Sequence, residues 1–240
     1  MTSQSRAAHD STAAEYDTAA SAAGWHPEAL LGLCLGRVRP GDLVLAVGIG
    51  TGLCAAPFAA HGLRVWGVDE SPRMLEVCRA KGIAERLVEH DLAVRPWPFG
   101  DAAVAHVLAA GVTHFLPDLG AFVAECARVM SDDGVLAITT RLPRDPVRPG
   151  ASDVETALVG GVPVHAHAPG LLAAALADAG LVAVAQLDVL LGADDARDVY
   201  RLTVAVRARP GVRDAPEPAD VRRAGPAPRT PVPASGPGTA

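Results

Sequence analysis

Cysteine, basic charge and long apolar runs are all scarce in this sequence. Only 4 of its 240 residues are cysteine, and they form no C-x-x-C pair and no spacing typical of metal ligands. We therefore predict reduced, buried thiols in a cytoplasmic protein, with no disulfide framework and no metal site. Aromatic residues make up 4% of the chain and half of the residues are apolar, which is ordinary for a soluble α/β protein.

The formal net charge is −6, so there is no electrostatic case for binding nucleic acid or an anionic membrane. No apolar run approaches the roughly 20 residues that span a bilayer. The N-terminus also lacks the charged, apolar and cleavage regions of a signal peptide. The length fits one domain with extensions at its ends.

The most informative stretch is an apolar run, 43–47, that stops at three alternating glycines, Gly48, Gly50 and Gly52. This pattern predicts a buried strand, a glycine loop and a helix over 53–61. Strand, loop and helix in this order open a doubly wound α/β domain, whose ligand lies beyond the carboxyl ends of the strands. Glycine allows the backbone to approach such a ligand and to adopt positive φ.

The glycine spacing narrows the class of ligand. A dinucleotide fingerprint, G-x-G-x-x-G, would have glycine where this chain has Leu53. No Lys-Ser or Lys-Thr follows the loop, which excludes a P-loop. A nicotinamide-dependent oxidoreductase remains an alternative, because it shares the opening strand, loop and helix.

A second predicted strand, 64–69, ends in Asp69 about 20 residues after the first glycine. A carboxylate at this position can accept hydrogen bonds from both hydroxyls of a ribose. In the following Glu70-Ser71-Pro72-Arg73-Met74-Leu75, Ser71 is placed to cap a helix and Pro72 suits its first turn. Gly82 is the expected end of that helix.

The G-x-G-x-G loop and the D-x-S-x-x-M-L stretch resemble class I S-adenosylmethionine-dependent methyltransferases, in the small-molecule branch around the ubiquinone and menaquinone methyltransferases. The resemblance implies S-adenosyl-L-methionine as cofactor and methyl transfer to an oxygen, nitrogen or carbon of a small molecule. It also implies that the loop packs against the methionine part, Asp69 and Glu70 lie at the ribose, and Met74 covers the adenine.

The same resemblance assigns residues further along the chain. Asp91, after a predicted third strand, would accept from the adenine amino group, and the amide of Leu92 would bond a ring nitrogen. After a fourth strand, 104–110, a G-V-x-H-x segment with Gly111 and His114 would face the transferable methyl group. His114 is the candidate general base for a hydroxyl acceptor, or it only shapes the pocket. Outside this core, Tyr16 is the leading candidate for a residue that faces the cofactor or the substrate.

The predicted fold is a single Rossmann-like domain with a seven-stranded, mostly parallel sheet and an antiparallel C-terminal edge hairpin. Residues 1–40 would form a helical lid, including short helices over 11–21 and 27–35. Residues 41–207 would form the methyltransferase domain, with a variable substrate segment at 141–168. Residues 208–240 hold eight of the 20 prolines and would be a disordered tail.

Two departures from the family pattern keep an alternative open. The family usually has an acid where this chain has Ala46, and Phe-Asp where it has Val104-Ala105. A missing carboxylate near the cofactor's ammonium favours a catalytically silent binding or scaffold protein.

His165 and His167 have the alternation of metal ligands, but no third ligand accompanies them. The acceptor and the oligomeric state are not indicated.

Overall fold

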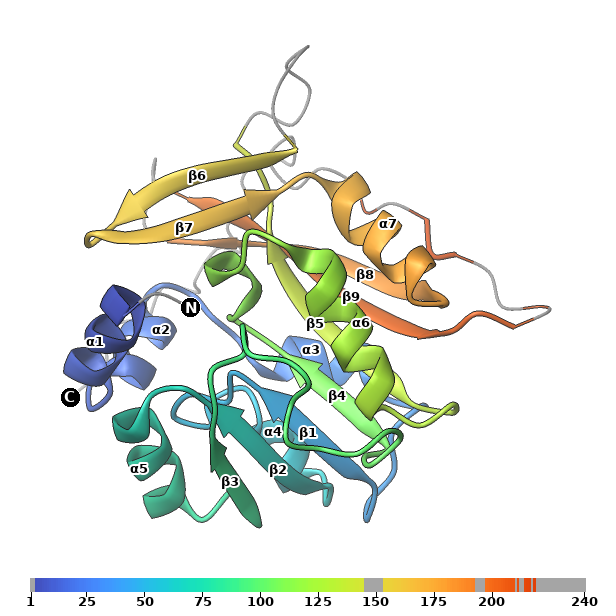
Figure 1. Ribbon diagram of the computed structural model, residues 1–240, viewed down its shortest axis with the longest axis horizontal. Helices are drawn as coiled ribbons and strands as arrows, with labels where there is room; N and C mark the ends of the chain where they lie inside the picture. The colour runs from blue at the N-terminus through green and yellow to red at the C-terminus, as the bar shows by residue number, and fades with distance from the viewer. Residues whose placement is uncertain are drawn as a thin grey trace, which may run out of the picture.

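A twisted seven-stranded sheet organises the molecule (Figure 1). The computed structural model describes residues 3–144, 153–192 and 197–209, and also residues 211, 214–216 and 218. Five strands are parallel neighbours in the order β3-β2-β1-β4-β5, and they are β1 (Leu43–Val47), β2 (Arg64–Asp69), β3 (Arg86–Glu89), β4 (His106–Ala109) and β5 (Val135–Arg141). These strands are short and mostly buried, as the apolar runs of the sequence predict.

The C-terminal edge of the sheet is an antiparallel hairpin. Strand β9 (Asp198–Arg207) lies between β5 and β8 (Leu181–Leu191) and runs antiparallel to both. This topology confirms the predicted α/β fold with its seven strands and its edge hairpin. The strand order reverses between β1 and β4, so the ends of these strands form the crevice where such folds bind ligands.

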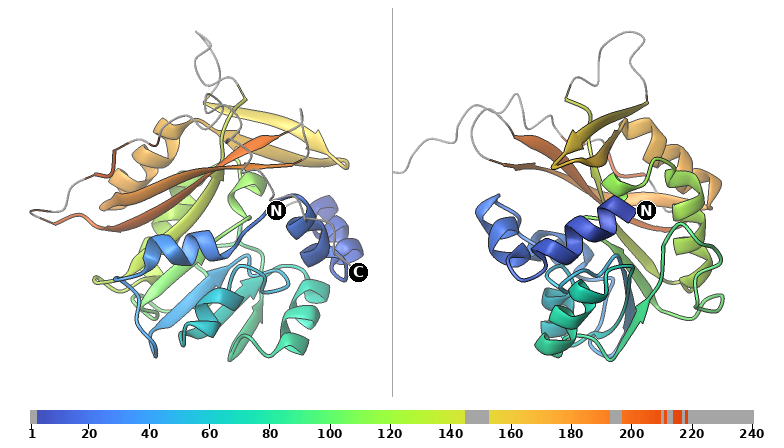
Figure 2. Two further views of the ribbon diagram at one scale, coloured as in Figure 1. Left: turned by 180° about the vertical axis from the view of Figure 1, so that it is seen from behind. Right: turned by 60° about the vertical axis from the view of Figure 1, so that its left-hand side comes forward.

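Helices cover both faces of the sheet (Figures 1 and 2). On one face, α6 (Leu119–Val129) and α7 (Pro169–Asp178) pack on one apolar cluster. On the other face, a second cluster includes residues of α3 (Glu28–Cys34), α4 (Ala56–Ala60) and α5 (Pro72–Lys81). None of the helices among the described residues is long and apolar enough to cross a membrane.

Capping residues fix where two of these helices begin and end. The Ser71 hydroxyl accepts from the Met74 N–H at 3.1 Å, and Gly82 ends α5 in the left-handed conformation at φ 65°. Both predictions about α5 are therefore confirmed. At α6, the Asp118 carboxylate caps the N-terminus by accepting from Gly120 and Ala121.

A buried charge network holds the loop between β3 and β4 against α6. The Trp97 N–H donates to Glu125 at 2.6 Å, and Arg128 donates to Glu125 at 2.5 Å and to the Phe99 carbonyl at 3.0 Å. The Trp97 indole N–H donates to the Leu92 carbonyl at 3.2 Å. These bonds satisfy the hydrogen-bonding capacity of the buried Glu125 carboxylate. The bond from Trp97 also holds Leu92 in place.

Two local expectations are wrong. The predicted helix over 11–21 is broken into α1 (Ser3–Thr12) and α2 (Tyr16–Ala22) by a turn in which Ala13 is buried. Packing of that turn overrides the weak preference of an alanine-rich stretch for one helix. The helix predicted over 53–61 is shortened to α4, because turns occupy most of the residues between Gly52 and Ala56.

The predicted variable segment at 141–168 contains a separate two-stranded sheet, β6 (Val154–Val159) and β7 (Val162–His167). Gly160 and Gly161, at φ 57° and 82°, form the two-residue turn between them. A Gly-Gly pair between two runs with β-branched residues is typical of a β-hairpin, so this pattern could have predicted the turn. The disorder predicted for 208–240 falls largely outside the described residues.

Candidate active site

The glycine loop after β1 adopts backbone conformations that favour glycine. Gly48, Gly50 and Gly52 have φ of 67°, 55° and 84°. A Cβ at Gly48 would lie 2.6 Å from a methyl of Val112, and one at Gly52 would lie 2.9 Å from the Cys78 sulfur. At Gly50 no atom lies within 4 Å of that position, so this glycine leaves room for a ligand to approach the backbone.

Asp69 is tied to the loop by its carboxylate. One carboxylate oxygen accepts from the Gly50 N–H at 2.8 Å and the other from the Ser71 N–H at 2.9 Å. Burial raises the pKa of Asp69, although these two bonds oppose the shift. The Glu70 N–H is a third backbone donor to this carboxylate, which has about four acceptor sites and so can still accept from a ligand.

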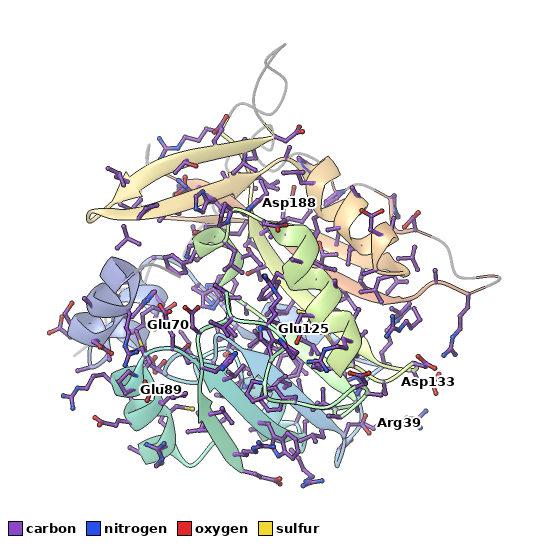
Figure 3. All side chains as sticks on the ribbon, in the orientation of Figure 1. Arg39, Glu70, Glu89, Glu125, Asp133 and Asp188 are labelled. Atoms are coloured by element: carbon purple, nitrogen blue, oxygen red, sulfur yellow. The ribbon has the colours of Figure 1, made fainter. Side chains whose placement is uncertain are left out.

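A partly open cavity of about 670 Å³, including its share of solvent, lies beyond the ends of β1, β2 and β4. It is lined by most of the residues that the sequence singled out, namely Tyr16, Gly48, Gly50, Asp69, Glu70, Met74, Leu92 and Gly111. Glu70 follows β2 on the side nearest α1 (Figure 3), and burial raises its pKa to about 6. The predicted residues are therefore brought together in one place.

Three of the predicted residues do not line this cavity. Gly52 lies behind the loop against Cys78. Asp91 accepts from the Ala93 N–H at 2.9 Å, in the turn that follows β3. His114 belongs to the short 3-10 helix η1 (Thr113–Phe115), of which Phe115 faces the cavity instead.

The N-terminal helices cover the cavity and contribute two of its residues, Tyr16 and His9. The Tyr16 hydroxyl lies 3.8 Å from the position a Cβ at Gly111 would occupy. Burial raises the pKa of Tyr16, so its hydroxyl remains a neutral hydrogen-bond donor. His9 packs edge-on against the ring of Phe115 at 4.8 Å. Sequence reasoning missed His9 because nothing local marks a contact between residues so far apart.

Polar contacts fasten these helices to the core. Asp17 accepts from the Thr51 hydroxyl at 2.5 Å, and its other oxygen pairs with Lys81. The Ser71 hydroxyl donates to Asp10 at 2.5 Å. These three contacts attach the N-terminal helices to the glycine loop and to the two ends of α5.

His114 is surrounded by aromatic rings. Its ring lies 4.1 Å from that of Phe115 and 5.9 Å from that of Tyr200. Its buried Nδ1 has no hydrogen-bond partner among the residues that the structure describes. Burial, and then the charge of Arg141, lower the pKa of His114 to about 3. The imidazole is therefore neutral, and it is a weaker base than a free histidine.

A metal centre has no support in the described ranges, which contain no group of three or more His, Cys, Asp or Glu side chains able to hold an ion. His165 and His167 lie in β7 with ring centroids 6.4 Å apart. His167 bonds the Leu116 carbonyl through Nε2 at 2.9 Å. It therefore helps to join the β6–β7 hairpin to η1.

Comparison with known proteins agrees with this geometry. Residues 45–138 match the family model of a methyltransferase domain. Over 128 residues the chain is 34% identical to malonyl-(acyl-carrier protein) O-methyltransferase from Serratia marcescens, covering 53% of this chain and 49% of that protein. Over 106 residues it is 33% identical to demethylmenaquinone methyltransferase from Tropheryma whipplei, covering 42% of each. The chain thus spans half the length, or less, of these curated relatives.

The fold is also similar to that of a solved methyltransferase. The crystal structure of magnesium protoporphyrin IX methyltransferase from Synechocystis PCC 6803 with bound S-adenosylmethionine superposes with a TM-score of 0.55 and 19% identity, covering 75% of this chain and 77% of that one. At this identity the likeness concerns the fold alone. Residues 45–138 therefore match a methyltransferase domain, and the curated relatives and the fold agree with a class I S-adenosylmethionine-dependent methyltransferase.

Proposed function

We propose that this protein transfers the methyl group of S-adenosylmethionine to a nucleophilic atom of a small molecule. The observation that carries the proposal is the placement of Asp69. Its half-buried carboxylate is anchored to the glycine loop, lines the cavity and keeps acceptor capacity for a ligand. Such a group is suited to the two hydroxyls of a ribose.

The residues of the cavity fit the cofactor. The open space at Gly50 suits the methionine part, and Asp69 with Glu70 would hold the ribose. Met74 and Leu92, both buried in the cavity wall, would contact the adenine. Because burial raises the pKa of Asp69, hydroxyl donors from a ligand would relieve the cost of its desolvation.

The cofactor, when bound, supplies a sulfonium methyl group that is already a strong electrophile. The protein contributes by holding the acceptor in line with that methyl, which can lower the barrier by roughly 7 to 11 kcal/mol in favourable cases. Tyr16 and Phe115 line the cavity together with His9, and we assign the positioning of the acceptor to this group. His9 and Tyr16, from α1 and α2, also shield part of the cavity from water.

The proposal that the acceptor is a small molecule is supported by the curated relatives. Malonyl-(acyl-carrier protein) O-methyltransferase and demethylmenaquinone methyltransferase are each matched over half of their length or less, so their substrates do not transfer to this chain. Transfer to oxygen, nitrogen or carbon is compatible with the cavity. An amine acceptor would need no strong base, whereas a hydroxyl acceptor would benefit from one.

The test is calorimetric titration with S-adenosylhomocysteine, with NADH and NADPH as controls. The expected result is saturable binding of S-adenosylhomocysteine alone, weakened at least about tenfold in Asp69→Asn. Glu85→Gln is the matched control, because Glu85 is an exposed carboxylate that pairs with Arg64 outside the cavity. Binding of a nicotinamide nucleotide instead would overturn the proposal, and Leu53, which lines the cavity, argues against that outcome.

Cofactor binding is necessary for the proposed activity but does not demonstrate it. The second half of the test measures transfer from S-adenosylmethionine carrying a labelled methyl group to a panel of small-molecule acceptors. Labelled product that disappears in Asp69→Asn and persists in Glu85→Gln would support catalysis. Tight cofactor binding without labelled product on a broad panel would favour the silent scaffold that Ala46 suggests.

A further inference from the structure

Arg141, the last residue of β5, is a buried cation with incomplete pairing. Its side chain is 9% exposed, and its Nη2 donates to Asp198 at 2.9 Å. The buried Nε has no hydrogen-bond partner within the described ranges. An unsatisfied guanidinium nitrogen is costly to bury, so this site is suited to a further acceptor.

Asp198, which pairs with Arg141, is shared with a second arginine. Asp198 also accepts from Arg144 Nε at 3.3 Å, and that second arginine is 66% exposed. One carboxylate therefore serves two guanidinium groups, so Asp198 compensates the charge of the buried Arg141 only in part. A bound anion would complete the pairing of the buried Arg141.

The cluster lies next to the aromatic wall of the cavity. Arg141 is the cross-strand partner of Tyr200 in the β5–β9 ladder, so the two side chains leave the same face of the sheet as neighbours. The Tyr200 ring packs edge-on against His114 at 5.9 Å, and His114 contacts Phe115 at 4.1 Å. Phe115 lines the cavity. Tyr200, His114 and Phe115 therefore form a row of side chains between Arg141 and the cavity proposed for the cofactor.

Arg141 is the charged group that acts most strongly on His114 in this row. Besides burial, the groups that lower the pKa of His114 are Arg141, His9, His167 and His165. Burial also raises the pKa of Tyr200 to about 12, so its hydroxyl stays protonated and can donate. Burial lowers the pKa of His165 and of His167, so Arg141 supplies the positive charge beside the cavity.

We propose that Arg141, flanked by Tyr200 and His114, binds a carboxylate of the methyl acceptor, so that the substrate is a small organic acid. This inference rests on the proposed function. The planar guanidinium offers parallel N–H groups that match a carboxylate. A single buried guanidinium matches the one charge of a carboxylate, whereas a phosphate monoester, at about −1.5 to −2, would leave negative charge buried.

The experiment titrates the full-length protein, saturated with S-adenosylhomocysteine, with benzoate, salicylate, cinnamate and octanoate, each paired with its primary amide. The expected result is that at least one acid binds at least about tenfold more tightly than its amide. Arg141→Gln should abolish that preference, whereas Arg144→Gln should retain most of it. This control also removes a guanidinium from Asp198, but from its exposed side.

Each variant is checked by thermal melting and by its affinity for S-adenosylhomocysteine, which Arg141→Gln should leave within about twofold of wild type. If Arg141→Gln does not fold, Arg141→Lys keeps the charge and should still lose most of the preference, because lysine lacks the planar fork. No preference for any acid, or a preference that survives in a folded Arg141 variant, would overturn the inference. Failure of S-adenosylhomocysteine to bind wild type would overturn the proposed function instead, and the acids would then be titrated without it.

Discussion

The carboxylate of Asp17 accepts a hydrogen bond from the hydroxyl of Thr51 at 2.5 Å, across 34 positions of sequence. Thr51 lies inside the glycine loop and is buried, whereas Asp17 belongs to the short helix that carries Tyr16. The other oxygen of Asp17 pairs with Lys81 at the end of α5. One side chain of the N-terminal helices is therefore linked to both segments that flank the proposed cofactor cavity.

Asp17→Ala should loosen the covered form of the cavity. The lost contacts are partly exposed and together contribute on the order of 1 kcal/mol, so we expect about fivefold weaker binding of S-adenosylhomocysteine. Faster release, measured by stopped-flow, should account for most of the change. Glu15→Ala is the control, since it removes an exposed acid from the residue just before α2. Equal effects of the two variants would contradict a specific role of the Asp17 contact.

Ala46 marks a second testable position, because it lines the cavity and is 3% exposed near the carboxyl end of β1. In Ala46→Asp, a carboxylate would face the ammonium of the bound cofactor, and we expect affinity for S-adenosylhomocysteine to rise by about 1 to 3 kcal/mol. Without ligand, the same carboxylate is buried and unpaired, so the melting temperature should fall.

Two controls separate this interpretation of Ala46 from a general change in the cavity. Ala46→Asn has nearly the same shape without the charge and should not strengthen binding. Methylthioadenosine has the adenosine part of the cofactor but no ammonium, so Ala46→Asp should leave its affinity unchanged. A gain for both ligands would show that the aspartate acts by some route other than charge pairing.

The sequence predicted those parts of the site that are encoded locally. The loop from Gly48 to Gly52 and the acid at Asp69 lie at the ends of adjacent parallel strands, and their spacing along the chain determines their proximity. Met74 follows from the capped helix after β2. Such features depend on a few neighbouring residues, so periodicity and glycine placement are sufficient to predict them.

Other parts of the site depend on tertiary contacts that no local pattern encodes. His9 reaches Phe115 and the cavity from the first helix, and Arg141 meets Tyr200 only because β9 inserts between β5 and β8. His114 matched a family pattern, yet its electrostatic state depends on Arg141 and on three histidines distant in sequence. Burial and long-range charge therefore had to come from the structure.

The low pKa of His114, about 3, predicts how activity responds to pH. Turnover on a small-molecule acceptor should show no limb near pH 6.5 that is due to this imidazole, because it remains neutral throughout the pH 5–8 range. The measurement is a pH–rate profile of wild type and His114→Asn. A limb near pH 6.5 that disappears in the variant would instead show that His114 titrates as a free histidine does.

The same shift predicts a pH dependence of stability. The unfolded chain protonates His114 near its ordinary pKa of 6.5, but the folded protein does so only near 3. As pH falls through this window the unfolded state binds more protons, so the free energy of unfolding decreases. At pH 5 the loss should be about 1 to 2 kcal/mol relative to pH 7. Urea unfolding of wild type and His114→Asn at both pH values isolates the contribution, since all other titrating groups are common to both proteins, and an equal loss in the two would refute it.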